Sequence, residues 1–241
     1  IYEIDLNGET IDTLAVLGQD MEGIAANEAG DTLYVVEERN RKIVTYLANG
    51  TRIGDFVLPH DPDSNDGFEG IAYDAETGYL LVLQSKNPTE LITLRPNGIE
   101  LGRQSLGFSP DVTGLAIHPS WGTLFVLSDE GFSLNELTRS GVLLRSWYLP
   151  IDQAEGVAFD PGTGDVYIVS DRGQNLHRFI IQEGAHQALN GVRLNELMAR
   201  NNVTIQDNFN EFDDWVEVIN TGAEAVDFAK AYFTNDLLAP R

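Results

Sequence analysis

One short phrase, an acidic or hydroxyl residue followed by Gly, an aliphatic residue and Ala, occurs four times in this chain of 241 residues. The glycines of the phrase are 47, 44 and 42 residues apart, at Gly23, Gly70, Gly114 and Gly156. A repeat of roughly 40–50 residues with several short apolar strands is typical of β-propellers, in which each repeat forms one blade. Because one blade cannot bury both faces of its sheet, we expect the repeats to stack around an axis, with binding sites where that axis opens.

The second repeat shows the pattern of a four-stranded blade. Its predicted strands, which are joined by tight turns, are residues 71–74, 79–83, 91–94 and 99–106. Residues 1–18 match only the third and fourth strands of a blade, and the fourth repeat shows no clear strand after residues 176–181. The sequence therefore predicts an all-β fold with a β-propeller over residues 1–185. We expect about four blades plus a half, which indicates a parent propeller of five or more blades.

Acidic residues gather on one predicted face of this propeller. If the first strand of each blade runs from top to bottom, the loops between blades and the loops between second and third strands share the top face. Glu22, Glu69 and Glu155 then lie at the mouth of the axis, and Asp129 and Asp171 lie in loops beside them. Further acids on that face are Asp20, Glu37, Glu38, Asp66, Asp111 and Asp152.

The five mouth carboxylates are candidate metal ligands. Carboxylates about 6 Å apart repel each other by about 3 kcal/mol per pair at an effective dielectric constant near 20, which favours a protonated member or a bound cation. Oxygen-only ligands suit Ca²⁺. We therefore predict Ca²⁺ at Glu22, Glu69, Glu155, Asp129 and Asp171. The alternative interpretation is that the Glu side chains cap first-strand amides or face a wide, hydrated channel.

Charge and composition exclude several classes of function. A formal net charge of −23 makes nucleic acid and anionic membranes unfavourable partners, because every approach is repulsive. The chain has no cysteine, which excludes disulfides, thiolate nucleophiles and cysteine-ligated zinc or iron–sulfur sites. No run of about 18 apolar residues is present to span a bilayer. The chain opens at Ile1 in the middle of a repeat and shows no signal peptide, so we expect residues upstream of Ile1.

Motifs of hydrolytic enzymes are not found. The four histidines form neither an H-x-H nor an H-E-x-x-H pattern, and no G-x-S-x-G elbow occurs. His118 occupies the hairpin-turn position that Asn27, Asp74 and Asp160 fill in the other repeats, and is therefore predicted as a turn residue on the bottom face. We predict no catalytic residue.

The repeated phrases resemble a known family. They are AEGVAFDP at residues 154–161, VYIVSDR at 166–172, and GLA at 114–116 followed by LFVLSDE at 124–130. These phrases are similar to the SdiA-regulated family, bacterial propellers that are related to esterase-like phytase and other calcium-binding propellers. The resemblance covers residues 1–183. It implies the propeller fold and an extracellular, periplasmic or cell-surface location, and it implies little about a reaction.

A second resemblance covers residues 190–241. The segments are VRLNELMA at 192–199, FDDWVEVINTG at 212–222, AVDF at 225–228 and YFTND at 232–236. They are similar to the start of a lamin tail domain, an immunoglobulin-like β-sandwich found in secreted bacterial proteins. Since a sandwich of this kind needs about 100 residues, the resemblance implies roughly the N-terminal half of one.

Two functions follow from these features. The first is a non-catalytic secreted or cell-surface binding module, stabilised by Ca²⁺, that presents the top face of the propeller to a ligand or protein partner. The alternative is a calcium-dependent hydrolase of phosphate or carboxylate esters, in which the mouth carboxylates hold the metal that activates water. Phosphate substrates favour basic neighbours, and the top loops offer few of them: Arg39, Arg41, Lys42, Lys86 and Arg172.

Overall fold

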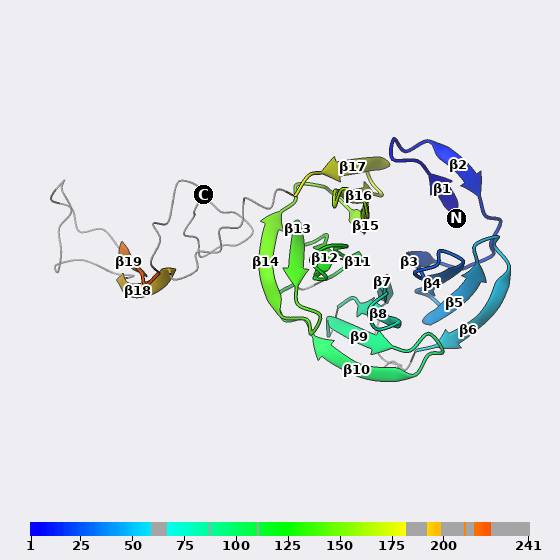
Figure 1. Ribbon diagram of the computed structural model, residues 1–241, viewed down its shortest axis with the longest axis horizontal. Coiled ribbons are helices and arrows are strands. Elements are labelled where there is room, and N and C mark those ends of the chain that lie inside the picture. The colour runs from blue at the N-terminus through cyan, green and yellow to red at the C-terminus, as the bar shows by residue number, and fades with distance from the viewer. Residues whose placement is uncertain are drawn as a thin grey trace. The chain divides into compact units, whose positions relative to one another are not determined.

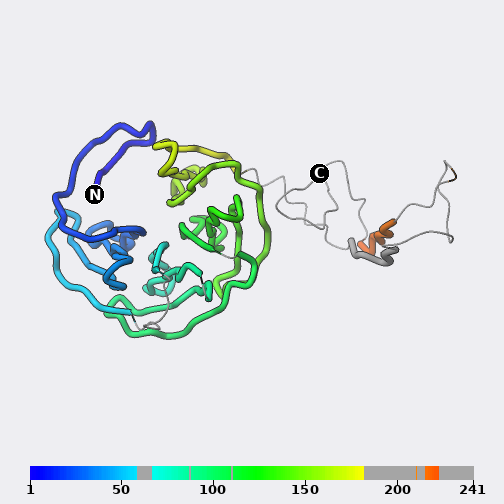
Figure 2. Tube along the Cα trace, turned by 180° about the vertical axis from the view of Figure 1, so that it is seen from behind, coloured from blue at the N-terminus to red at the C-terminus, as the bar shows by residue number. Residues whose placement is uncertain are grey.

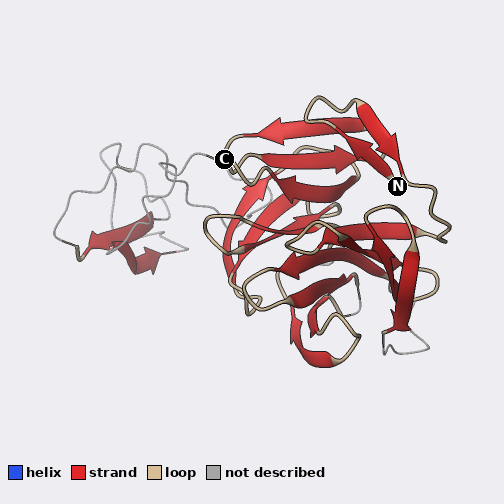
Figure 3. Cartoon of the chain, turned by 45° about the vertical axis from the view of Figure 1, so that its right-hand side comes forward, coloured by secondary structure: helices blue, strands red, loops and turns tan. Residues whose placement is uncertain are grey.

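The chain is built from β-strands joined by short turns (Figure 3). The computed structural model describes residues 1–58, 67–86, 88–109, 111–181, 192–198, 210 and 215–222. These residues contain nineteen strands and no helix, which confirms the predicted all-β class. Accordingly, the described part of the chain offers no apolar helix of membrane-spanning length. The described residues belong to two compact units, Ile1–Ile181 and the segment that carries the last two strands.

Three four-stranded antiparallel sheets and one three-stranded sheet form the blades. The first blade is β3 (Met21–Ala26), β4 (Thr32–Glu37), β5 (Lys42–Leu47) and β6 (Arg52–Val57). The second blade is β7 (Phe68–Asp74), β8 (Tyr79–Gln84), β9 (Glu90–Leu94) and β10 (Glu100–Ser105). The third blade is β11 (Leu115–Ile117), β12 (Leu124–Ser128), β13 (Ser133–Leu137) and β14 (Leu143–Tyr148). The fourth blade is β15 (Ala154–Phe159), β16 (Val166–Ser170) and β17 (Asn175–Phe179).

The blades stand around a common axis with their first strands innermost (Figure 1). Strand β3 packs against β7, β7 against β11, and β11 against β15. The remaining sheet of this unit is the pair β1 (Tyr2–Ile4) and β2 (Thr10–Thr13), which matches the predicted half blade. In Figure 2 this N-terminal segment follows the rim of the ring between the fourth and the first blade. The predicted blade strands are thus confirmed, including the three-stranded fourth blade.

Apolar side chains fill the space between consecutive blades. Val36 of the first blade and Ile71 of the second belong to one buried cluster, and Leu83 and Leu115 join the second blade to the third in another. Each such side chain contributes roughly 1.5–3 kcal/mol when fully buried. The rings of Tyr34 and Tyr73 also stack across the first interface, with their centroids 6.2 Å apart.

Glycine lets the first strands approach each other closely. A Cβ on Gly23 would lie 2.4 Å from the carbonyl oxygen of Glu69 and 2.9 Å from the backbone nitrogen of Ile71. A Cβ on Gly114 would lie 2.9 Å from the carbonyl oxygen of Glu155. No Cβ fits at these distances from backbone atoms, so the repeated Gly is required by packing between blades.

The hairpin turns between first and second strands share one design. In the fourth blade Oδ1 of Asp160 accepts the backbone N–H of Gly162 at 2.7 Å, and in the second blade Oδ1 of Asp74 accepts that of Glu76 at 3.0 Å. In the third blade His118 takes the place of this carboxylate, and its Nδ1 accepts the backbone N–H of Ser120 at 3.2 Å. The predicted turn role of His118 is confirmed.

The second unit is described only in part. Strands β18 (Val192–Met198) and β19 (Trp215–Asn220) pair antiparallel. The other segments of the predicted lamin-tail-like half sandwich, including residues 225–228 and 232–236, lie outside the described residues.

Replacing Gly23 with Ala tests the close approach of the first strands. The added Cβ collides with the backbone of the second blade, so we expect Gly23→Ala to destabilise the propeller by roughly 1–3 kcal/mol in urea unfolding. Gly54 is the matched control, because it lies in β6 with no atom within 4 Å of its Cβ position. Gly54→Ala should be neutral or stabilising by up to about 1 kcal/mol. Equal losses in the two variants would contradict the packing role of Gly23.

Candidate functional site

The candidate site is a cavity of about 380 Å³ where the axis opens beside the first strands. It is lined by seven carboxylate residues, one Lys and two hydroxyl residues: Glu22, Glu69, Ser85, Lys86, Asp111, Thr113, Asp129, Glu130, Glu155 and Asp171. We call this set the acidic mouth. All five residues predicted from the sequence as metal ligands belong to it, although they come from four different blades. Their role as ligands stays a prediction.

A repeated backbone hydrogen bond brings the loop acids to the first-strand acids. The N–H of Glu38 donates to the carbonyl of Asp20 at 2.9 Å in the first blade, and the N–H of Asp171 donates to Gln153 at 3.0 Å in the fourth. Asp20 and Gln153 both have left-handed backbones, with φ of 54° and 51°. The bond ties the end of the second strand to the residue that precedes the first strand. Loop and first-strand carboxylates of one blade are therefore held side by side.

Glu69 is the most strongly perturbed acid of the mouth. Its side chain is half-buried, and this burial, together with the negative charges of Glu22, Glu38 and Glu155, raises its pKa to about 8. Lys86 opposes the shift. Near neutral pH Glu69 therefore holds a proton for much of the time, unless another cation takes the place of that proton.

Glu22 and Glu155 are shifted in the same direction. Partial desolvation raises the pKa of Glu22, followed by the negative charges of Glu38 and Asp20. Burial also raises the pKa of Glu155, with Asp129 as the largest charge contribution. The three first-strand glutamates thus share one electrostatic environment in which adding a positive charge is favourable.

The third blade departs from this pattern. Thr113 replaces the first-strand Glu, and its hydroxyl donates to the carbonyl of Ala154 at 2.6 Å, which ties the third blade to the fourth. Asp111 is buried, and its two carboxylate oxygens accept the hydroxyl of Ser128 at 2.7 Å and the N–H of Glu130 at 3.1 Å. Asp111 therefore holds the neighbouring loop in place, and its oxygens are already engaged.

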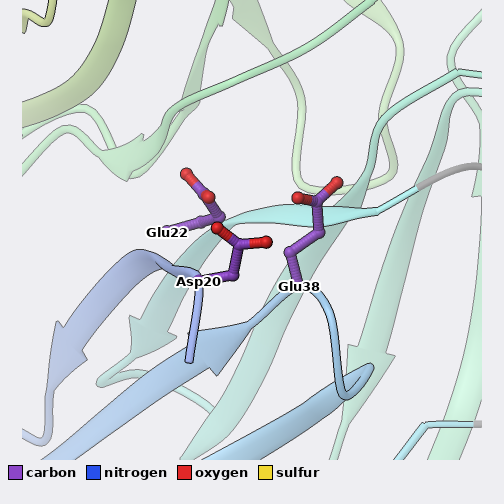
Figure 4. Close-up of side chains that lie close together, drawn as sticks. All are labelled: Asp20, Glu22 and Glu38. Atoms are coloured by element: carbon purple, nitrogen blue, oxygen red, sulfur yellow. The ribbon is translucent and has the colours of Figure 1, made fainter. Parts of the chain in front are cut away.

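The tightest group of acids lies at the first blade. Ligand oxygens of Asp20, Glu22 and Glu38 all lie within 4.8 Å of one another, and the three carboxylates rise to the same side (Figure 4). The sequence placed Asp20 and Glu38 on this face without identifying them as ligands. Glu38 could have been found, because it follows its strand in the same way as Asp171 does in the fourth blade.

Positive charge is scarce at this opening. Lys86 is the one basic residue that lines the mouth within the described part of the chain, and its Nζ is 2.8 Å from Oε1 of Glu130. Arg39 pairs with Asp20 at 3.1 Å, and Arg172 pairs with Asp152 at 2.5 Å. Lys42, also predicted to lie near this face, pairs with Glu37 at 3.1 Å. Asp66, another predicted acid of this face, lies outside the described residues.

The chain is similar to known β-propellers. A family model described as SdiA-regulated matches residues 1–179. Among solved structures, the β-propeller domain of Cps50 (Swd1) from Myceliophteria thermophila shares 12% identity at a TM-score of 0.51, over 75% of this chain and 58% of that one. XC5397 from Xanthomonas campestris, a gluconolactonase, shares 18% identity at a TM-score of 0.50, over 66% and 58%. The chain thus spans 58% of the length of each structure, and identities this low show the fold alone.

Replacing Glu69 with Gln tests the electrostatics of the mouth. A carboxyl whose pKa is raised from 4.5 to about 8 binds its proton more tightly in the folded chain, so the folded state loses stability as the pH rises through that interval. Gln cannot ionise. Without metal, we expect Glu69→Gln to leave stability unchanged near pH 5 and to raise it by on the order of 1–2 kcal/mol at pH 9, after allowance for solvent screening.

Urea unfolding in the presence of EDTA at both pH values measures this difference. Glu76→Gln is the control, because this substitution makes the same chemical change in an exposed turn after β7. The control should show no comparable gain at pH 9. A loss of stability in Glu69→Gln at pH 9 would contradict the crowding of carboxylates around Glu69.

Proposed function

The chain belongs to the SdiA-regulated family, and we propose that within this family it serves as a non-catalytic binding module whose acidic mouth holds Ca²⁺. The ion stabilises the open end of the propeller. The face around it is then the surface offered to a ligand or protein partner.

One observation carries this proposal: seven carboxylates and one ammonium group surround a single cavity. Glu69 lies among them with a pKa of about 8, so its charged form is strongly disfavoured without a counter-charge. A divalent cation supplies that counter-charge and replaces the proton. Carboxylate oxygens, which this opening offers in number, are among the six to eight oxygen ligands that Ca²⁺ prefers.

The proposed ligands are the five predicted carboxylates with one addition. Glu22, Glu69, Glu155, Asp129 and Asp171 line the cavity from the first, second, third and fourth blades. Glu38 joins them through its short distance to Glu22. Asp111 is left out, because its oxygens already accept hydrogen bonds from the neighbouring loop.

An ester hydrolase is the less well supported alternative. A phosphate ester entering the mouth would meet seven carboxylates, and Lys86 alone among the lining residues could neutralise it. That Lys is already paired with Glu130 at 2.8 Å. Phosphate recognition favours Arg and Lys that converge on the ligand, and the charge of this mouth has the opposite sign.

The location and the C-terminal unit complete the proposal. Extracellular Ca²⁺ modules commonly bind with Kd values of about 10⁻⁴–10⁻³ M, which suits a site of mixed ligands at a surface. We place the module in the periplasm, outside the cell or at its surface, as the family resemblance implies. Residues 190–241 are proposed to be the start of a lamin-tail-like sandwich, with β18 and β19 as one of its hairpins, that connects the propeller to a further domain or surface.

Calcium binding is tested by thermal melts and calorimetric titration of the full chain. We expect Ca²⁺ to raise the melting temperature and EDTA to reverse the rise, because a ligand at 100 times its Kd stabilises the folded state by about 2.7 kcal/mol. Glu69→Gln and Glu155→Gln should weaken Ca²⁺ binding at least tenfold. Glu76→Gln, outside the mouth, should bind as the unmodified chain does.

Two outcomes would contradict the binding module. An unchanged melting temperature and no heat of binding at millimolar Ca²⁺ would exclude the ion. Calcium-dependent turnover of phytate, p-nitrophenyl phosphate or p-nitrophenyl acetate that disappears in Glu69→Gln would instead identify a hydrolase. Calcium stabilisation without turnover is the result that the proposal predicts.

A further inference from the structure

A slot interrupts the ring between the fourth and the first blade. Packing between first strands runs from β3 to β7, from β7 to β11 and from β11 to β15. Between β15 and β3 the rim is occupied by β1 and β2, which correspond to the outer two strands of a blade (Figure 1). A cavity of about 560 Å³ lies inside this rim, and its lining is mostly apolar.

The fourth blade exposes an apolar side chain to this slot. Val169 ends the apolar run of β16, and the corresponding residues of the first three blades are Val36, Leu83 and Leu127. Those three side chains are 0% exposed, whereas Val169 is 41% exposed. In the first three blades the next blade covers this position. At Val169 no blade among the described residues covers it, and the side chain is exposed.

The first blade exposes the complementary position. Ile24 follows the Gly of its phrase, as do Ile71 in the second blade and Leu115 in the third. Ile71 and Leu115 are 3% and 5% exposed because the preceding blade packs on them, whereas Ile24 is 47% exposed. Ile24 and Val169 both line the 560 Å³ cavity and thus form its opposite walls.

The repeated Gly indicates that the walls of the slot fit the backbone of a neighbouring strand. A Cβ on Gly23, Gly70 or Gly114 would lie 2.4–2.9 Å from a backbone atom of the next first strand. A Cβ on Gly156 would come close only to Cγ2 of Val169, at 2.7 Å, within its own blade. Gly156 therefore presents the same surface as the other three, and this surface fits the backbone of an extended strand.

The outer wall offers a strand edge. The third strands of the first three blades, β5, β9 and β13, pair with a strand on each side, whereas β1 pairs with β2 alone among the described strands. Ile4 and Leu6 line the cavity beside this edge and are 42% and 61% exposed. An unpaired edge next to an apolar cavity is suited to strand addition.

We infer that the slot is a binding site for a β-hairpin with the pattern of the first two strands of a blade. The second strand of the hairpin pairs with β1, and its first strand lies between Val169 and Ile24. The hairpin carries Gly where its first strand passes the backbone of β3, because the Gly of the earlier blade faces the later blade at each existing interface. Aliphatic residues of the hairpin cover Val169 and the residues next to Gly156.

Charge adds a preference at one position. The residue before the Gly of the hairpin would reach the axis between Glu155 and Glu22, which both line the acidic mouth. Without a bound cation, a third carboxylate beside these two acidic side chains is repelled by both of them. A hairpin with an uncharged residue at that position therefore binds more tightly than one with Glu.

A synthetic peptide that copies residues 67–86, the hairpin β7–β8 of this chain, is the probe. Its fluorescence anisotropy with the full chain should show saturable binding. In the peptide, Gly70→Val should weaken binding tenfold or more, because the added side chain meets the backbone of β3, and Glu69→Gln should strengthen it. In the chain, Val169→Asp should weaken binding tenfold or more. Val142→Asp is the matched control: Val142 is 59% exposed before the outermost strand of the third blade and should change nothing.

A second experiment covers the case in which the free peptide does not form a hairpin. The same 20 residues joined to Ile1 through a flexible Gly/Ser linker should raise the melting temperature of the chain, and the Gly70→Val version should not. Absence of both peptide binding and this rise would overturn the inference. The inference would also be overturned if the Gly70→Val peptide bound as tightly as the unmodified peptide. It would be overturned as well if the unmodified peptide bound the Val169→Asp chain as tightly as the unmodified chain. Dimerisation that Val169→Asp abolishes and the peptide does not compete with would assign the slot to a second copy of the chain instead.

Discussion

The backbone of each first strand lies so close to the next that only Gly fits between them, and this contact positions everything else near the axis. A Cβ on Gly23 would lie only 2.4 Å from the carbonyl oxygen of Glu69. The residue before each Gly is carried by the same contact to the end of the axis, and in three blades that residue is Glu. Three buried clusters between the blades hold the carboxylates together against their mutual repulsion, since each fully buried aliphatic side chain contributes roughly 1.5–3 kcal/mol.

The sequence alone was sufficient to predict the strands of the blades and the clustering of acidic residues on one face. In the second blade the predicted runs coincide with β7 to β10 to within a few residues, because apolar alternation and Gly-containing turns leave little freedom of register. The five candidate ligands meet at one cavity because antiparallel order fixes which loops share a face. The short distances within the set Asp20, Glu22 and Glu38 could not be foreseen, although the position of Glu38 after its strand could have been. Its distances depend on a left-handed backbone at Asp20, a tertiary property of the turn.

Two further features could not be predicted from the sequence, because residues of the same type have different surroundings in the fold. In the sequence Asp111 is one more acid of the top face, but hydrogen bonds from Ser128 and Glu130 make it part of the loop scaffold. Val169 and Ile24 have the same pattern as their buried counterparts, and only their exposure marks the slot. The mouth and the slot share Glu22 and Glu155 in their linings. If both proposed sites are occupied, the charge at one acts on the other, and the two proposed binding events would be linked in free energy.

The central claim is that packing between blades forces the first-strand carboxylates into one electrostatic environment. Titration of the Glu69 side-chain carboxyl by ¹³C NMR, assigned by its loss in Glu69→Gln, measures this environment at a single atom. Without metal we predict a midpoint near pH 8, well above the ordinary value of 4.5. A midpoint near 4.5 would mean that Glu69 is solvated and apart from the other acids, and would contradict the claim.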